Sequence, residues 1–121
     1  MSLLTLFESA EDAVDFKEGT VIFEQGSPGD VMYIILDGEV EIIVDHKPLE
    51  VVHTGDLVGE MALIDSRSRS ASCIAKTDCK LAPCDEKKFL FMIQEHPFFA
   101  LLVMNVLVDR IRAQAFDRFS D

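Results

Sequence analysis

The sequence predicts a mainly β protein with flanking helices, in which short antiparallel strands build a sandwich or barrel and two helices follow. Three observations carry this prediction. Short runs of β-branched and aromatic residues recur at intervals of about eight to twelve residues. All six glycines lie between such runs, and none follows Gly59. After residue 85 the apolar residues change from alternating to helical spacing.

The predicted strands are runs of strand length bounded by turn-forming residues. They cover residues 20–23, 31–36, 40–44, 49–52, 70–75 and 80–84. Asp37-Gly38 separates the second run from the third and is typical of a tight hairpin turn. Residues 3–13 fit either a short helix or an edge strand.

Two helices are predicted after the strands. Asp85 is a suitable N-cap for a helix that includes Phe89 and Ile93. His96-Pro97 ends this helix, because the residue before a proline avoids the helical region. Proline favours the first turn of a helix, so a second helix is expected from Phe98 to about Phe119.

The last helix carries an apolar stripe with the a/d spacing of a coiled coil. Its members are Leu101, Met104, Val108, Ile111 and Ala115. One interpretation is that the stripe packs on the strands. The other is a helix with two apolar faces, one for the core and one for a second copy of the chain, which makes residues 97–119 a homodimer interface.

Length and charge limit the function classes. The 121 residues are expected to form a single domain over 1–121, with strands in about 14–84 and helices in about 85–119. Acidic residues number 22 against 11 basic ones, a net charge of −11. Because phosphate neutralisation requires clustered Lys and Arg, this charge excludes direct nucleic-acid binding.

Targeting and redox signals indicate a cytoplasmic protein. The longest apolar stretch, residues 97–108, is interrupted by Asn105 and is too short for a membrane span. The first four residues lack a basic leader, so no signal peptide is expected. The three cysteines form no C-x-x-C pair and lie in strand-like runs, which favours buried, reduced thiols over a redox role. They are Cys73, Cys79 and Cys84.

No catalytic or metal-binding pattern is found. The histidines are dispersed and form neither H-x-H nor H-E-x-x-H, so no metal site is predicted. Gly26-Ser27-Pro28-Gly29 has the wrong spacing for a nucleophile elbow and is interpreted as a turn. The chain is therefore predicted to have no catalytic residues.

Residues 59–72 carry recognisable chemistry. After Gly59 come four residues of good helix propensity, enough for one short turn whose unpaired backbone N–H groups favour an anion. Arg67 and Arg69 follow, and a guanidinium can bind a phosphate through two parallel hydrogen bonds. Because the carboxylate of Glu60 accepts from hydroxyl groups, the pattern describes a sugar phosphate site. The alternative is an exposed polar loop whose arginines offset the acidic surface.

The segment resembles the phosphate-binding cassette of cyclic nucleotide-binding domains, the sensor domains of the catabolite activator protein superfamily. That pattern is Gly-Glu-(Leu/Met)-Ala-Leu, a variable stretch, then Pro-Arg-(Ala/Ser/Thr)-Ala-(Thr/Ser). Residues 59–63 and 69–72 match its two parts, and Ser68 replaces the proline. The resemblance extends over residues 14–115, with all six glycines at family turns. It implies an antiparallel β-roll (a double-stranded β-helix or jelly roll) plus two C-terminal helices.

The resemblance also implies residue roles. Glu60 is expected to accept a hydrogen bond from the ribose 2′-hydroxyl, and Arg69 to pair with the cyclic phosphate. Backbone N–H groups around Met61 and Ala62 would bind its other oxygens. Gly59 would let the backbone approach the ribose closely.

The base is expected between a wall near Val51 and Val58 and a lid from the last helix, with Arg110 or Arg112 as the lid residue. Ser70 supplies a hydroxyl found in family members that respond to cAMP and in those that accept cGMP; cAMP is favoured here. The implied ligand-binding set is Val51, Val58, Gly59, Glu60, Met61, Ala62, Arg69, Ser70, Ala71 and Arg110.

The expected function is a non-enzymatic regulatory module that senses a cyclic nucleotide and needs no cofactor. Because the chain ends near the end of its last helix, its effector is expected to be a separate protein or a missing fused domain. Two alternatives keep the fold: a ligand-free interaction domain, and a haem-binding sensor with His53 or Met104 as ligand. A metal-dependent cupin enzyme would need a histidine and carboxylate cluster that the sequence lacks.

Overall fold

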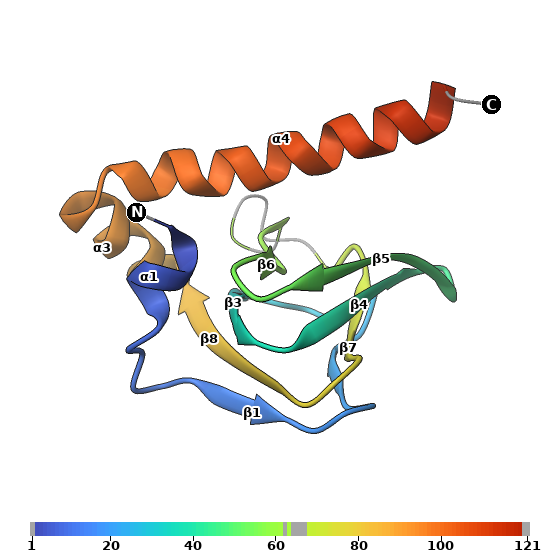
Figure 1. Cartoon of the computed structure of the whole chain (residues 1–121), viewed down its shortest axis with the longest axis horizontal. Helices are drawn as coiled ribbons and strands as arrows, with labels where there is room; N and C mark the ends of the chain where they lie inside the picture. The colour runs from blue at the N-terminus through green and yellow to red at the C-terminus, as the bar shows by residue number, and fades with distance from the viewer. Residues whose placement is uncertain (1, 62, 64–67, 120–121) are drawn as a thin grey trace.

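The computed structural model describes residues 2–61, 63 and 68–119; residues 1, 62, 64–67 and 120–121 lie outside the described part (Figure 1). Within it, two four-stranded antiparallel sheets have the orders β1-β8-β3-β6 and β2-β7-β4-β5. The first sheet comprises β1 (Val14–Phe16), β8 (Cys79–Asp85), β3 (Val31–Asp37) and β6 (Leu57–Val58). The second comprises β2 (Val21–Phe23), β7 (Ser72–Ala75), β4 (Glu39–Val44) and β5 (Lys47–His53). With helices following the last strand, the predicted β-roll is confirmed.

All six predicted strands are present, with ends shifted by at most two residues. Two strands were not predicted, β1 and β6. They are only three and two residues long, so neither shows a recognisable alternation of apolar and polar residues.

The hairpin predicted at Asp37-Gly38 is wrong. β3 and β4 belong to different sheets, so the chain turns a corner there instead of folding back. Gly38 has φ +101°, and a Cβ on it would lie 2.5 Å from the carbonyl oxygen of Asp78. The chain turns a second corner between β7 and β8, and this corner packs directly against Gly38. A residue with a Cβ would clash there, so glycine is required.

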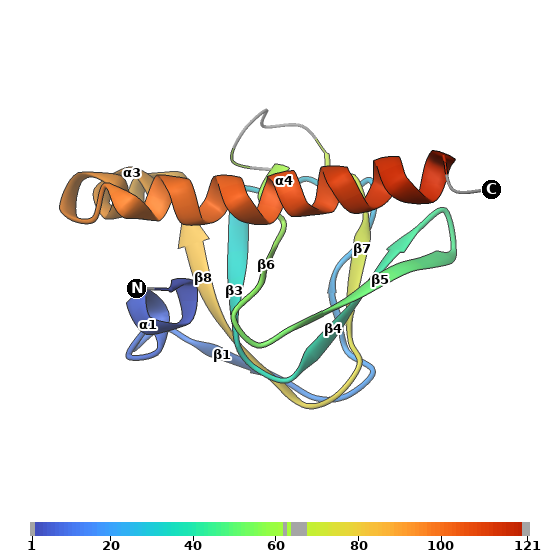
Figure 2. The ribbon, with the colours of Figure 1, turned by 45° about the horizontal axis from the view of Figure 1, so that its top comes forward.

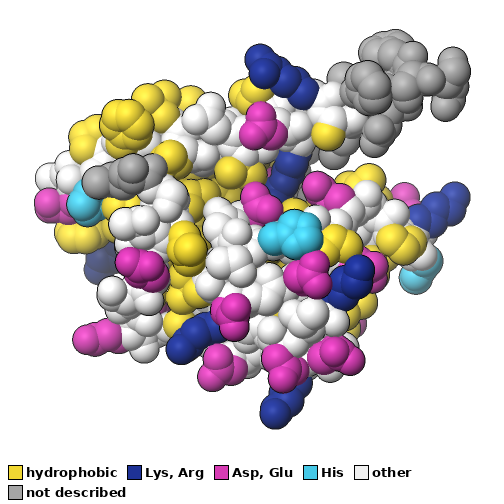
Figure 3. All heavy atoms as spheres, in the orientation of Figure 1, with side chains coloured by type: hydrophobic (Ala, Val, Ile, Leu, Met, Phe, Trp, Pro, Cys, Tyr) yellow, Lys and Arg dark blue, Asp and Glu magenta, His cyan; other side chains and the backbone are white. Residues whose placement is uncertain are grey.

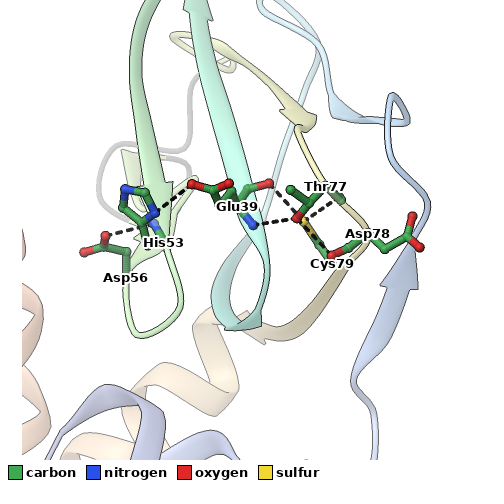
Figure 4. A network of polar contacts seen from close by, with 6 residues as sticks. All are labelled: Glu39, His53, Asp56, Thr77, Asp78 and Cys79. Atoms are coloured by element: carbon green, nitrogen blue, oxygen red, sulfur yellow. Dashed lines mark hydrogen bonds and ion pairs between the residues drawn. The ribbon is translucent and has the colours of Figure 1, made fainter.

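Side chains and backbone join the two corners (Figure 4). The Glu39 N–H donates to Thr77 Oγ1 at 3.0 Å. The Lys76 N–H donates to the Glu39 carbonyl at 2.9 Å. The Cys79 thiol donates to the same carbonyl at 3.1 Å. These contacts hold the two sheets together where both chain segments cross between them.

The tight hairpin lies instead between β4 and β5. Asp45 and His46 occupy its two central positions with φ 51° and 67°, a geometry that usually requires glycine or asparagine. Gln25 stabilises it, because its side chain donates to Asp45 Oδ1 at 3.0 Å and accepts from the Asp45 N–H at 2.8 Å. The partner is twenty residues away, so local sequence did not reveal this turn.

Three helices complete the described fold: α1 (Leu3–Phe7), α3 (Glu86–Glu95) and α4 (Phe98–Phe119). The N-terminal segment thus forms a helix, with Ser2 Oγ accepting from the Thr5 N–H at 3.2 Å. Asp85 caps α3 as predicted, accepting from the Lys88 N–H at 2.8 Å. The break at His96-Pro97 between α3 and α4 is also confirmed.

Two hydrophobic cores lie on opposite faces of the first sheet. One fills the space between the sheets and is made by Ile35, Val40, Ile42, Val52, Val58, Cys73, Ala75, Cys79 and Leu81. The other packs the sheet against the helices and is made by Leu3, Phe7, Met32, Ile34, Leu57, Ala82, Cys84, Met92, Phe99 and Val103. Beyond this second core, α4 extends across the end of the roll (Figures 1 and 2).

The three cysteines are buried and unpaired, as predicted. Among the described residues, no three His, Cys, Asp or Glu side chains are grouped closely enough to hold a metal ion. In the same part of the chain, no single helix has the length and apolar character of a membrane span. Only α3 and the first part of α4 together meet that criterion, and they are bent by 119°.

Candidate functional site

A cavity of about 390 Å³ lies between the roll and α4. Both sheets, the segment after β6, the segment before β7, and α4 contribute to its wall. Its lining residues are Phe23, Ile42, Val44, Leu49, Glu50, Val58, Gly59, Glu60, Met61, Arg69, Ser70, Ala71, Cys73, Leu107, Arg110 and Ile111.

Arg69 reaches the cavity from a segment whose backbone is fixed on both sides. Its N–H donates to the Ser27 carbonyl at 2.8 Å, and its own carbonyl accepts from the Gly26 N–H at 2.9 Å. The guanidinium carbon lies 4.0 Å from the centre of the Phe23 ring, a cation–π contact. Gly29 makes room for it, since a Cβ there would lie 2.0 Å from Arg69 Nε.

The guanidinium of Arg69 is buried, and it forms no ion pair with any of the described residues. The residue is 8% exposed, and its Nη1 donates to the Gly59 carbonyl at 3.2 Å. Its Nε has no hydrogen-bond partner, and no carboxylate of the described residues forms an ion pair with it. Burial lowers the pKa of Arg69, and nearby Tyr33 acts in the opposite direction. An arginine nevertheless stays protonated at neutral pH, so Arg69 presents a positive charge at the cavity wall.

Gly59 is required next to this charge. Its φ of +81° is unfavourable for other residues, and a Cβ would lie 2.7 Å from Arg69 Nη1 and 3.2 Å from the Val31 carbonyl oxygen. After Gly59, Met61 and Leu63 have helical backbone, and the Leu63 N–H donates to the Glu60 carbonyl at 3.1 Å.

Glu60 is a buried carboxylate paired with an arginine from the last helix. Arg110 Nη1 donates to Glu60 Oε1 at 2.9 Å, and Arg110 Nη2 donates to the Leu57 carbonyl. Arg110 Nε also lies 3.7 Å from Glu50 Oε1. Fifty residues separate Arg110 from Glu60, so only the tertiary fold brings α4 over the cavity.

Most of the predicted site residues meet in this one cavity. Its lining includes Val58, Gly59, Glu60, Met61, Arg69, Ser70, Ala71 and Arg110. Ala62 and Arg67 lie outside the described residues. Of the two lid candidates, Arg110 points inward with its side chain 14% exposed, whereas Arg112 is exposed.

Val51 was expected to line this cavity and does not. In the β4–β5 register Val52 and Glu50 face the buried residues Val40 and Ile42, so the intervening Val51 faces the other side of the sheet. Glu50 and Leu49 line the wall instead, Leu49 at a bulge where the register shifts. Strand alternation from Val52 is the signal that could have identified Glu50.

The haem ligands considered from sequence are not near the cavity. Neither His53 nor Met104 is among its lining residues. His53 instead lies 3.1 Å from a Glu39 carboxylate oxygen, with a side chain 62% exposed (Figure 4). Met104 is 55% exposed on α4. The geometry gives the haem alternative no support.

Most of the apolar stripe of α4 faces outward. Leu101, Met104 and Val108 are 40–55% exposed, whereas Phe99 and Val103 on the opposite side are buried. Ile111 is 65% exposed but lines the cavity. The interpretation that the stripe packs on the strands is therefore wrong for Leu101, Met104 and Val108. Hydrophobic side chains also gather over α3 and the start of α4 (Figure 3), where Leu90, Phe91 and Phe98 are exposed.

Comparison with known proteins agrees with this geometry. The family model of the cyclic nucleotide-binding domain matches residues 13–96. The cAMP-dependent protein kinase regulatory subunit of Aspergillus fumigatus is 41% identical over 75 residues, covering 60% of this chain and 18% of that protein. The cyclic AMP receptor protein of Thermus thermophilus is 31% identical, covering 80% of this chain and 47% of that protein. The chain thus spans less than half the length of either relative.

A solved structure has the same fold. The crystal structure of the Thermus thermophilus catabolite activator protein superposes with a TM-score of 0.78 at 26% identity, covering 93% of this chain and 60% of that one. The two relatives named above are regulatory proteins. Because the family model covers all eight described strands and all of α3, the chain belongs to the cyclic nucleotide-binding domain family.

Proposed function

We propose that this chain binds a 3′,5′-cyclic nucleotide, cAMP in preference to cGMP, and acts as a non-enzymatic regulatory module. The observation that carries the proposal is Arg69. A buried guanidinium without a carboxylate partner among the described residues, and with an unpaired Nε, needs an anion in the adjoining cavity. A cyclic phosphate supplies one negative charge and acceptor oxygens without requiring the basic surface that a polyanion needs.

The other predicted residues fit around this anion. Glu60 would accept from the ribose 2′-hydroxyl while the hydrogen bond from Arg110 orients its carboxylate. Gly59 leaves space for the ribose, and backbone N–H groups at Met61 and Ala62 would bind phosphate oxygens. Val58, Ser70 and Ala71 belong to the same wall, and α4 closes the cavity with Arg110 as the lid residue.

Ligand titration tests the proposal. At a hundredfold excess of ligand over the dissociation constant, binding stabilises the folded state by about 2.7 kcal/mol, which a thermal-shift assay detects. We expect such a shift with cAMP and a weaker affinity for cGMP. Little effect is expected with 5′-AMP, whose phosphate carries two charges and forms no cyclic diester. If none of the three nucleotides shifts the transition at millimolar concentration, the proposed function is wrong.

Arg69→Ala tests whether the buried guanidinium of Arg69 binds the phosphate. A charge-assisted hydrogen bond contributes about 1.5–3 kcal/mol, so the variant should bind cAMP at least about tenfold more weakly by calorimetry. Arg112→Ala removes an exposed guanidinium from α4 and is the matched control, with affinity expected to stay unchanged. Equal affinities for Arg69→Ala and the parent would contradict the assignment.

The regulatory output is proposed to pass through α4. Residues 1–121 would act as one binding unit, and its exposed stripe would contact a second copy of the chain. Ligand capture by residues 59–72 would shift the short turn after Gly59 against α3 and α4, and so the position of α4. An effector in trans or a fused effector domain would respond to the changed position of α4. The buried, unpaired thiols are in keeping with a reducing, cytoplasmic setting.

A further inference from the structure

The carboxylate of Glu50 lies among the apolar side chains that β4, β5 and α4 contribute to the cavity. The apolar residues are Ile42, Val44, Leu49, Leu107 and Ile111. Glu50 faces the same interior because it lies opposite the buried Ile42. Its carboxylate is half-buried, and among the described residues its ion-pair partner is Arg110, whose Nε lies 3.7 Å from Glu50 Oε1.

The position of Glu50 relative to the sugar follows from Arg110. This guanidinium contacts Glu60 through Nη1 at 2.9 Å and Glu50 through Nε at 3.7 Å. The two carboxylates are therefore neighbours, separated by one guanidinium group. The side chain of Glu60 is 11% exposed and that of Glu50 is 36% exposed, so Glu50 is the outer of the two.

We propose that Glu50 reads the base, selecting a purine with an amino group at C6. The inference rests on the proposed function, in which the ribose lies on Glu60 and the phosphate on Arg69. The base must then extend past Glu50, and C6 lies on the side of the purine far from the sugar. A carboxylate only accepts hydrogen bonds, so it binds the adenine amino group and repels the carbonyl oxygen of guanine. Glu50 is thus the residue that makes the site prefer cAMP.

The affinities of three cyclic nucleotides distinguish the effect of the group at C6 of the purine from that of the group at C2. Cyclic GMP has a C6 oxygen and a 2-amino group, whereas cyclic IMP has the C6 oxygen alone. The parent should bind cAMP about tenfold more tightly than either. The difference arises because Glu50 accepts a hydrogen bond from the amino group of adenine and repels the C6 oxygen of the other two bases. If cyclic IMP binds as tightly as cAMP, or cyclic GMP more tightly, Glu50 does not read C6 and the inference is overturned.

Glu50→Gln tests the residue itself. An amide both donates and accepts, so it serves either C6 group, and the ratio of affinities for cAMP and cyclic IMP should fall to about one. A merely structural role through Arg110 would weaken all three nucleotides alike and leave the ratio unchanged, which would overturn the inference. Glu41→Gln removes the same charge from β4, next to Ile42 but outside the cavity lining, and should keep the parental ratio.

The two proposals fail in different ways. If the parent binds no cyclic nucleotide, the proposed function is wrong and this inference is lost with it. If all three nucleotides bind with one affinity, cyclic nucleotide binding stands, but the preference for cAMP and the role of Glu50 are both wrong.

Discussion

Arg69 is held in place by neighbours that do not neutralise it. Phe23 stacks on the guanidinium, Gly59 offers a carbonyl, and Gly29 leaves the space that its Nε occupies. Each contact fixes the geometry of the group while its charge remains available. Glu60 differs, because its carboxylate already has a partner in Arg110. In the proposed function the two charged residues of the motif therefore have unequal tasks, Arg69 holding the anion and Glu60 orienting a hydroxyl group.

Glu60→Gln separates these tasks. An amide is a poorer acceptor than a carboxylate and loses the ion pair with Arg110, so cAMP binding should weaken by about tenfold. The loss should be smaller for 2′-deoxy-cAMP, which has no hydroxyl for Glu60 to bind. Calorimetry with both ligands measures the difference. Equal losses would contradict the ribose role of Glu60.

Among the elements, the β4–β5 hairpin carries local strain. His46 adopts a positive φ of 67° at a cost of about 1–2 kcal/mol, because its Cβ crowds the backbone. Glycine avoids this crowding, but ordering its more flexible backbone costs about 0.5–1 kcal/mol of chain entropy, which offsets part of the gain. We therefore expect His46→Gly to raise the free energy of unfolding by about 0.5–1 kcal/mol in urea.

Lys47→Gly is the matched control for that substitution. Lys47 is the first residue of β5, where glycine brings the entropy cost without relieving strain. Its free energy of unfolding should fall. If His46→Gly also lowers the free energy of unfolding, the turn is not strained at this position.

The buried thiols of β7 and β8 predict a loss of stability in alkali. Burial raises the pKa of Cys73 and that of Cys84 from 9.0 to about 12. Above pH 9 the unfolded chain loses these protons and the folded chain keeps them, so stability falls as pH rises toward 12. Each thiol contributes about 1.4 kcal/mol per pH unit within that window.

Urea unfolding of the parent and of Cys84→Ala at pH 8, 9 and 10 measures this contribution. The variant is expected to be less stable at pH 8, because it lacks buried contacts, and to lose less stability between pH 9 and 10. Parallel pH profiles for the two proteins would show that Cys84 does not cause the alkaline loss.

For the whole molecule, the outward stripe of α4 predicts self-association. Met104 and Val108 lie at its centre, and their exposure is costly for a chain that remains monomeric. Met104→Glu should lower the dimer affinity by at least about tenfold in sedimentation experiments, through desolvation and repulsion across a symmetric interface. Ala113→Glu adds the same charge to α4 outside the stripe and should change little. A parent that is monomeric at all concentrations would refute the dimer.

Much of the fold follows from patterns that operate over a few residues. Glycine-bounded runs predicted six strands, Asp85 predicted the start of α3, and His96-Pro97 predicted the break before α4. The local motif at residues 59–72 also identified Glu60 and Arg69. Asp37-Gly38 shows the limit, because a dipeptide specifies a turn but not whether the strands on either side pair with each other.

The sequence by itself therefore determined six of the eight described strands, the helices α3 and α4, and the charged residues Glu60 and Arg69 of the motif, because propensity, capping and motif spacing are local properties. Only the tertiary structure decided that Arg110 lies on Glu60, that Glu50 rather than Val51 faces the cavity, and that the stripe of α4 remains exposed. Each of these depends on which face of an element is turned toward a distant one. That choice is made by packing between segments up to fifty residues apart. Strand alternation places Glu50 and Val52 on one face of β5, but packing decides that this face is turned toward the cavity.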